Sequence, residues 1–184
     1  MPTDEYMVKG STIRSKLDFV KDRFGEGAKN AIEGRFQGRG LHPLLTASWY
    51  PYELYVELLE AIVDAHFDGD ASRLVTVGER SADEALKTVY RSFVRERGFD
   101  DFLQGIATLH HLFYNLGRID VVAEKGATSC EIHQRDKPRY AEADLYIAAG
   151  FYQRAAELHG LTDVQCSFTT GPDGADFALS WNKS

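Results

Sequence analysis

The sequence predicts an α+β fold, in which N-terminal helices are followed by a ββαββ order whose strands form a four-stranded antiparallel sheet covered by helices. Two observations carry this prediction. Apolar residues recur at helical spacing through the first half, and from Ile119 onward short segments rich in β-branched or alternating residues flank tight turns. Because the links between these segments are short, we expect antiparallel neighbours in one sheet, with helices on one face.

The N-terminal helices are predicted from their apolar stripes and their ends. One stripe, which Gly25 suitably ends, consists of Ile13, Leu17, Val20 and Phe24. A weak short helix over residues 28–35 follows, and then a loop. Pro51 is suited to the first position of the next helix, where its missing N–H costs nothing. The inner face of that helix is expected to hold Leu54, Leu58, Ile62 and Ala65.

Two further helices are expected before the strands. Ser81 and Glu84 have the spacing of a capping box, which predicts a helix from Ser81 to about residue 96, after a short piece over residues 74–78. After Gly98, an apolar stripe that begins at Phe102 predicts an amphipathic helix that closes at Gly117.

The C-terminal part is predicted as two hairpins separated by a helix. Residues 119–123 and 128–134 form the first hairpin around residues 124–127. A helix over residues 142–159 follows. Strands over 164–170 and 175–181 then flank the turn of residues 171–174.

Length and charge bound the class of protein. A chain of 184 residues without repeat or linker fits a single domain over residues 1–184. The net charge of −7 argues against a nucleic-acid partner. Two cysteines, no secretory start and no long apolar run predict a cytoplasmic protein without a membrane span.

Motifs of the familiar enzymes are absent from the sequence. Residues 25–30 imitate half of a dinucleotide fingerprint, but they follow a helix and lack the third glycine, so a helix–helix turn is the favoured reading. We find no Walker sequence, nucleophile elbow or paired-histidine zinc helix. The sequence therefore predicts no cofactor, no catalytic residues and no enzyme.

The histidines and cysteines allow a weak metal hypothesis. Adjacent His110 and His111 point about 100° apart on a helix, so a core-edge His110 hydrogen-bonded to a neighbour is favoured. A metal site with Cys130 or Cys166 and His133 is short of ligands, and buried thiols are the alternative.

Aromatic residues gather in two places. Trp49, Tyr50, Tyr52 and Tyr55 could line a cavity, cover a partner surface or fill the core. Tyr146 and Phe151 flank Gly150, a mid-helix glycine that suggests close approach of a strand, another protomer or a ligand.

An ordered series of segments resembles the superfamily of 4-vinyl reductase domains, heme-NO-binding domains and Bet3-type subunits of the TRAPP transport tethers. Within it, the likeness is closest to a bacterial paralogous family of uncharacterised sensor-like domains. The segments that carry it are KGSTIRSKLDFVKDRFG (9–25), SWYPYELYVELLEAI (48–62), YRSFVR (90–95), YNLGRIDVV (114–122) and YIAAGFYQRAAELHG (146–160), with the end at Trp181. The resemblance implies an often dimeric α+β fold whose relatives bind small hydrophobic molecules, heme or lipid, or serve as assembly modules.

The sequence departs from these relatives at two sites. Ala175 stands where a second cysteine would accompany Cys166, which weakens a paired-cysteine metal or redox site. The heme-NO-binding branch uses a helix histidine and a Tyr-x-Ser-x-Arg clamp. Here Tyr114 and Arg118 have the outer residue types, but the serine is missing. We therefore do not expect this chain to bind heme as the heme-NO-binding branch does.

The leading hypothesis is a non-enzymatic sensory domain that binds a small, mainly apolar ligand and pairs with itself or a signalling partner. Arg118 would anchor a ligand carboxylate or phosphate, or would form a surface ion pair with Asp120 or Glu124. The alternatives are a dimerising or tethering module without ligand and, by analogy, a vinyl-reductase-like enzyme. A cavity of about 300 Å³ or more would favour the ligand. Its candidate lining residues are Trp49, Tyr52, Tyr55, His110, Tyr114, Arg118, Tyr146 and Phe151.

Overall fold

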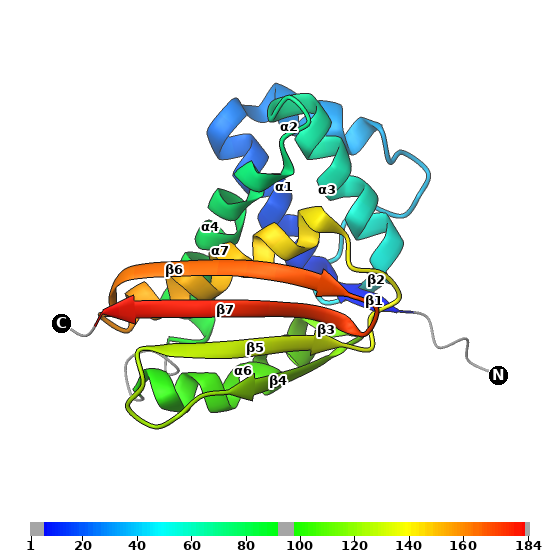
Figure 1. Cartoon of the computed structure of the whole chain (residues 1–184). Helices are drawn as coiled ribbons and strands as arrows, with labels where there is room; N and C mark the ends of the chain where they lie inside the picture. The colour runs from blue at the N-terminus through cyan, green and yellow to red at the C-terminus, as the bar shows by residue number, and fades with distance from the viewer. Residues whose placement is uncertain (1–5, 92–97, 183–184) are drawn as a thin grey trace.

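The computed structural model describes residues 6–91 and 98–182 of the chain (Figure 1). Its helices are α1 (Gly10–Phe24), α2 (Glu26–Gly34), α3 (Tyr52–His66), α4 (Val75–Glu84), α6 (Phe99–Phe113) and α7 (Glu142–Leu158), with a 3-10 helix η1 (Ala71–Leu74) and a π-helical turn η2 (Ala85–Val89). The strands are β1 (Met7–Lys9), β2 (Trp49–Pro51), β3 (Tyr114–Asn115), β4 (Arg118–Val122), β5 (Ser129–Arg135), β6 (Thr162–Gly171) and β7 (Gly174–Asn182).

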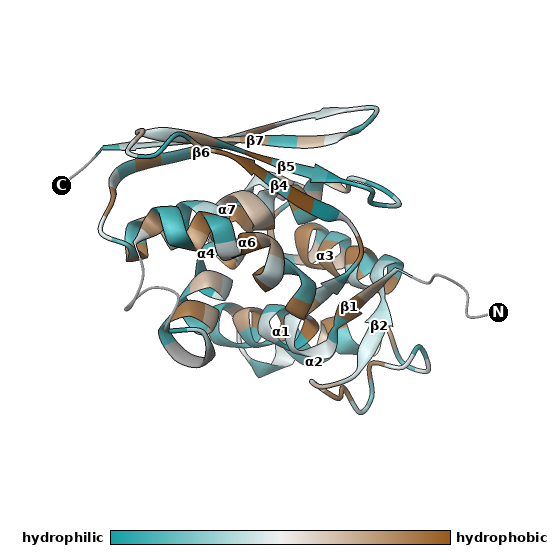
Figure 2. Ribbon diagram, turned by 90° about the horizontal axis from the view of Figure 1, so that it is seen from below, coloured by the Kyte–Doolittle hydropathy of each residue, from teal (hydrophilic) through white to brown (hydrophobic). Residues whose placement is uncertain are grey.

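The larger sheet confirms the predicted fold class. Its four antiparallel strands have the order β4-β5-β7-β6, and α7 connects the two hairpins. Figure 2 shows the labelled helices on one side of this sheet, with α6 and α7 nearest to it. The strands alternate accordingly: Ile132 and Phe177 are fully buried under the helices, whereas Glu131 and Asp176 point to the open face.

A second, three-stranded sheet, which the sequence analysis did not predict, has the order β2-β1-β3. It joins three segments distant in sequence through pairs such as Val8 with Tyr50 and Val8 with Tyr114. Strands of two or three residues are too short to show a period of two, so sequence patterns cannot reveal them. Pro51 ends β2, and α3 begins one residue later than predicted.

The predicted capping box at Ser81 is wrong. Ser81 lies inside α4, which begins at Val75, and its Oγ donates to the carbonyl of Val77 at 2.7 Å. Glu84 accepts a hydrogen bond from Ser15 Oγ instead. The helix therefore starts before the capping signal, and η2 continues it. Residues 92–97 of the predicted helix lie outside the described residues.

Gly150 has a packing role against α4. A Cβ atom at Gly150 would lie 2.1 Å from the carbonyl oxygen of Val75, and one at Gly78 would lie 2.1 Å from that of Ile147. The two glycines thus let the backbones of α4 and α7 touch. A strand, another protomer or a ligand was expected from the sequence beside Gly150. The structure instead places helix α4 there.

The connection between the first two helices agrees with the prediction from the sequence. Gly25, with φ of 94°, ends α1 and separates it from α2, so the expected helix–helix turn lies at Gly25. The short helix that follows begins at Glu26, two residues before its predicted start. In the described residues, no helix is long and apolar enough to cross a membrane.

The buried apolar residues divide into two clusters. The first is formed mainly by α1, α3 and the small sheet and includes Leu17, Tyr55 and Leu58. The second lies between the larger sheet and helices α6 and α7 and includes Phe102 and Phe177. The space where these clusters meet positions the candidate site.

Candidate functional site

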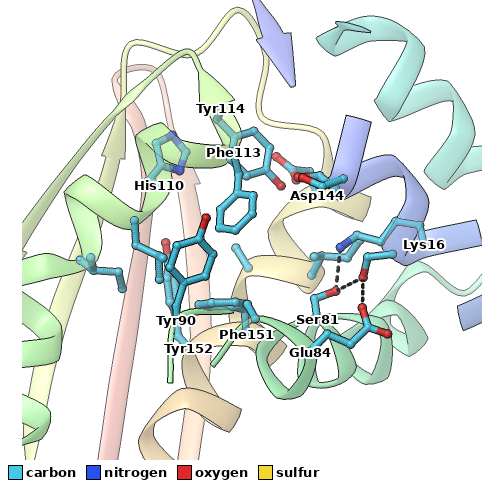
Figure 3. A pocket seen from close by; sticks show the side chains of 18 of the residues that line it. Lys16, Ser81, Glu84, Tyr90, His110, Phe113, Tyr114, Asp144, Phe151 and Tyr152 are labelled. Atoms are coloured by element: carbon cyan, nitrogen blue, oxygen red, sulfur yellow. Dashed lines mark hydrogen bonds between the residues drawn. The ribbon is translucent and has the colours of Figure 1, made fainter. Parts of the chain in front are cut away.

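A cavity of about 330 Å³ lies between the two core clusters (Figure 3). Helix α1 contributes one wall, and α4 with η2 a second. Helices α6 and α7 contribute most of the rest, together with Tyr114 from β3, Gln134 from β5 and Lys137 from the loop after β5. Its lining residues are Ser11, Thr12, Ser15, Lys16, Ser81, Glu84, Ala85, Tyr90, Ile106, Leu109, His110, Phe113, Tyr114, Gln134, Lys137, Asp144, Ile147, Ala148, Phe151 and Tyr152.

Aromatic rings form much of the lining. Tyr90 and Phe113 pack edge to face with centroids 5.6 Å apart, and Phe151 and Tyr152 do so at 6.3 Å. Ile106, Leu109 and Ile147 add aliphatic surface. Such walls suit an apolar or aromatic ligand, because ring faces and edges supply contact area at little entropic cost.

A buried lysine lines the cavity from α1. Lys16 is 2% exposed, and its Nζ donates to Ser81 Oγ at 2.7 Å. Burial lowers the pKa of Lys16 to about 8, although Glu84 and Asp144 act in the opposite direction. The ammonium is therefore charged at neutral pH in a place where charge is costly.

A second polar cluster lies at the N-terminal end of α7. The buried carboxylate of Asp144 accepts hydrogen bonds from Lys137 Nζ and from Tyr52 Oη, both at 2.8 Å. Burial acts to raise the pKa of Asp144, but Lys137 and the two hydrogen bonds outweigh it, so the net shift is downward. Asp144 and Lys137 thus form a buried ion pair.

Gln134 presents an unpaired amide atom. Its side chain is 2% exposed, and its Nε2 donates to Tyr152 Oη at 3.1 Å. Within the described part of the chain, its buried Oε1 has no hydrogen-bond partner. Turning the amide by 180° exchanges the two atoms and still leaves one of them unpaired.

His110 lies at the core edge and is hydrogen-bonded to a neighbouring residue, as predicted from the sequence. Its Nε2 donates to the Leu116 carbonyl at 2.8 Å, and its ring stacks on Tyr114 with centroids 4.9 Å apart. Burial lowers its pKa to about 4, although the bond to the Leu116 carbonyl acts to raise it.

Three of the eight predicted site residues line the cavity: His110, Tyr114 and Phe151. Tyr52 and Tyr55 lie behind the lining in the first cluster, where Tyr52 bonds Asp144 and Tyr55 Oη lies 3.4 Å from Tyr114 Oη. They support the site without lining it.

The other three predicted residues lie elsewhere. Trp49 is 38% exposed on β2, under the ammonium of Lys9. Tyr146 packs edge to face on Phe168. The side chain of Arg118 is 61% exposed and pairs with Asp120 at 2.8 Å, the alternative role given for it. Each of these three side chains interacts with a residue outside the cavity.

Lys16, Gln134 and Asp144 were not predicted as site residues, although their positions in the sequence carried a signal. Lys16 lies on the same helical stripe as Ile13 and Val20, and Asp144 precedes the buried Ile147 by three residues. Gln134 falls on the inward face of its strand, two residues after the buried Ile132. A polar residue on an apolar face was the clue in each case. Lys137 lies in a loop, where no such pattern exists.

The thiols show no sign of activation. Burial raises the pKa of Cys130 to about 11 and that of Cys166 to about 12. Over residues 6–91 and 98–182, no group of three histidine, cysteine or acidic side chains could hold a metal ion. His133 pairs with Asp176 on the open face of the sheet, whereas Cys130 is buried.

Comparisons with known proteins show similarity in fold alone. No protein-family model matches the chain, and curated proteins give no significant match. An Fe(II) unliganded H-NOX protein from K. algicida has a TM-score of 0.72 and 16% identity, over 96% of this chain and 97% of that one. An H-NOX protein from S. oneidensis in the Fe(II)NO ligation state has a TM-score of 0.75 and 13% identity, over 95% and 99%. A structure that probes heme distortion in the H-NOX family has a TM-score of 0.69 and 10% identity, over 95% of each chain.

Proposed function

We propose that this chain is a non-enzymatic sensory domain that binds a small, mainly apolar organic molecule in the cavity between its two core clusters. A signalling protein or a second copy of the chain would read the occupied state. The observation that carries the proposal is the cavity itself, which has about 330 Å³ of space and aromatic walls. Its volume lies within the range of about 300–1,000 Å³ typical of small-molecule sites.

The location of the cavity suits a sensor. Lys16 belongs to α1 in the first half of the fold, whereas Phe113 and Tyr152 belong to helices that pack on the larger sheet. A ligand that contacts both α1 and the helices on the larger sheet binds most tightly to one arrangement of these two parts. Because its affinity for that arrangement is higher than for others, binding increases the population of that arrangement. Occupancy can thus alter surfaces outside the cavity. A tethering module without ligand would have no need of this space.

The H-NOX neighbours raise heme as a ligand, since their descriptions name iron and heme. Heme iron needs an axial protein ligand, and His110 is the histidine of the cavity lining. Its Nε2 is bound to the Leu116 carbonyl, and Tyr114 covers one face of its ring. Arg118, the candidate for a propionate clamp, lies on the surface paired with Asp120.

The cavity also differs from a heme site in size and charge. At about 330 Å³ it is near the lower limit for drug-sized ligands, and heme is larger than most of these. The buried Lys16 and the Lys137–Asp144 pair lie in its wall. The residues present do not fit heme, and we propose a smaller organic ligand instead.

The proposal is tested on protein purified from its own host. Native mass spectrometry should detect a bound small molecule that organic extraction releases. Ala148 lines the cavity, so Ala148→Phe should abolish retention by filling the space. Ala31→Phe, on the exposed surface of α2, is the matched control and should retain the molecule. Equal retention by both variants, or none by the unaltered protein, would contradict the proposal.

A further inference from the structure

We infer that the ligand is an amphipathic carboxylate, whose acid group pairs with Lys16 and whose other end carries a hydroxyl group that binds Gln134. This inference rests on the proposed function and narrows it to a chemical class.

Lys16 has hydrogen-bonding capacity that the protein does not use. An ammonium has three N–H donors. Within the described part of the chain, the one hydrogen bond of Nζ goes to Ser81 Oγ. Ser81 in turn donates to the carbonyl of Val77. The remaining N–H groups belong to a buried side chain that lines the cavity, where an occupant could accept from them.

The carboxylates nearest to Lys16 are paired with other cations. Glu84 accepts from Arg80 Nε at 2.8 Å, and Asp144 accepts from Lys137 Nζ at 2.8 Å. Neither lies within ion-pair distance of Lys16 Nζ, since no salt bridge of 4.0 Å or less joins them. Among the described residues, the buried ammonium therefore has no counter-anion of its own. A ligand carboxylate would supply it.

An unneutralised buried ammonium is expensive for the fold. Methionine or leucine at this position on the apolar stripe would pack without the cost of burying charge. Positions that break a local rule without a compensating contact are commonly functional. The lowered pKa of Lys16 agrees with this geometry, because burial disfavours its charged form and an anionic partner would restore it.

Gln134 marks the other end of the ligand. Its unpaired Oε1 is buried and lines the cavity beside Tyr152. A buried amide atom without a partner costs free energy that a ligand can recover. A ligand hydroxyl both donates and accepts, so it satisfies the amide in either orientation. Lys16 comes from α1 and Gln134 from β5, so two different elements contribute these two polar groups to the cavity.

The middle of the cavity favours a flat or chain-like apolar body. Tyr90, Phe113 and Phe151 present rings there, as Figure 3 shows. Hydroxylated aromatic acids combine these three features: a carboxylate, an apolar plane and a distal hydroxyl. We therefore choose 4-hydroxybenzoate and 4-hydroxycinnamate as probes, which differ in length.

The test is a comparison of matched ligands and variants by isothermal titration calorimetry at pH 7. Each acid is measured against its methyl ester, which lacks the charge, and against its analogue without the hydroxyl. We expect at least one acid to bind about tenfold or more tightly than its ester. Lys16→Met should abolish this preference, so that acid and ester bind equally. Lys21→Met, at an exposed lysine on the same helix, should preserve it.

Gln134→Leu tests the hydroxyl contact in the same way. In the unaltered protein, the hydroxylated acid should bind several-fold more tightly than its analogue. In Gln134→Leu the two should bind alike. Both readouts are differences between ligands on one protein, so a uniform change in folding does not produce them.

A neutral dye separates the two proposals. N-phenyl-1-naphthylamine fluoresces in apolar sites and carries no charge. If it binds, and Ala148→Phe prevents this, while neither acid is preferred over its ester, the carboxylate inference is overturned and the ligand-binding proposal stands. If neither dye nor acids bind, both proposals fail. An acid preference that survives Lys16→Met would also overturn the inference.

Discussion

Tyr52 on α3 donates a 2.8 Å hydrogen bond to the buried carboxylate of Asp144 on α7, and Lys137 Nζ contacts the same carboxylate at 2.8 Å. This cluster ties the first core cluster to the helix that carries much of the cavity wall. It also keeps Asp144 ionised in the interior, as the lowered pKa of Asp144 reflects.

Loss of the cation from this cluster should destabilise the fold strongly. Lys137→Met leaves the Asp144 carboxylate buried without its counter-ion, which typically costs about 3–5 kcal/mol. Urea unfolding at pH 7 measures this change. Adding Asp144→Asn to Lys137→Met should recover part of the loss, because the remaining side chain is neutral. Lys125→Met, at an exposed lysine, is the control and should change stability little. A loss no larger than that of Lys125→Met would contradict the assignment of a buried pair.

The contact between α4 and α7 should tolerate no side chain at Gly150. The added methyl group of Gly150→Ala would meet the Val75 carbonyl, and we expect a loss of about 1–3 kcal/mol or more from overpacking. Gly27→Ala in α2 has open space around it and should gain up to about 1 kcal/mol from helix propensity. Thermal unfolding of the two variants gives the comparison, and equal midpoints would show that the helices do not touch there.

His110 should make the fold less stable in mild acid. Its pKa is about 4 in the folded protein and near 6.5 in the unfolded chain. Above pH 6.5 the imidazole is neutral in both the folded and the unfolded state, so its titration does not reduce the free energy of unfolding there. As the pH falls from 6.5 towards 4, the unfolded chain binds a proton on this histidine and the folded protein does not. The free energy of unfolding therefore falls, by on the order of 3 kcal/mol at most.

The variant His110→Gln isolates this effect, because its amide can still donate to Leu116 without titrating. Chemical unfolding at pH 7 and pH 5 should show a smaller acid loss for His110→Gln than for the unaltered protein. Equal losses would mean that His110 titrates normally. Asp144 is a separate contributor. Because folding lowers its pKa, its stabilising contribution is lost mainly at more acidic pH, as the unfolded chain takes up the proton first.

Heme should not bind through His110. Titration of the purified protein with hemin should give the same visible spectra for the unaltered protein and for His110→Ala. A Soret band that sharpens and shifts only when His110 is present would show axial ligation and would contradict the fit argued from the Leu116 hydrogen bond.

Sequence patterns predicted the larger sheet well, because its strands are long enough to alternate and its turns carry glycine and proline. The segments that became β5 and β7 show this most clearly: Ile132 and Phe177 face the helices, and their neighbours Glu131 and Asp176 do not. Ser81 shows the limit of local signals. Its spacing to Glu84 fits a helix start, yet the packing of Gly78 against α7 favours a helix that begins earlier.

The site was predicted only in part, for a related reason. Phe151 was identified as an aromatic residue beside Gly150, His110 as a histidine at the core edge of a predicted helix, and Tyr114 from the resembling segment 114–122. Whether a polar residue takes part in the cavity depends on two things. One is whether the lysine or glutamine lies on a buried apolar face, and the other is whether the charged side chains around it are paired with other residues. Arg80 pairs with Glu84 within one helix and Lys137 pairs with Asp144 from a loop, so that among the described residues neither carboxylate is left to pair with Lys16.

Methyl-resolved NMR of the protein with N-phenyl-1-naphthylamine reports where an apolar molecule binds, and it therefore decides whether the cavity takes up a ligand. Ile106, Leu109 and Ile147 line the cavity, whereas Leu58 and Leu59 are fully buried elsewhere in the first cluster. We predict saturable shifts of the three cavity methyl sets, with those of Leu58 and Leu59 little changed. Shifts confined to surface methyl groups such as those of Leu45 and Val122, or no shifts at all, would contradict a ligand-binding cavity.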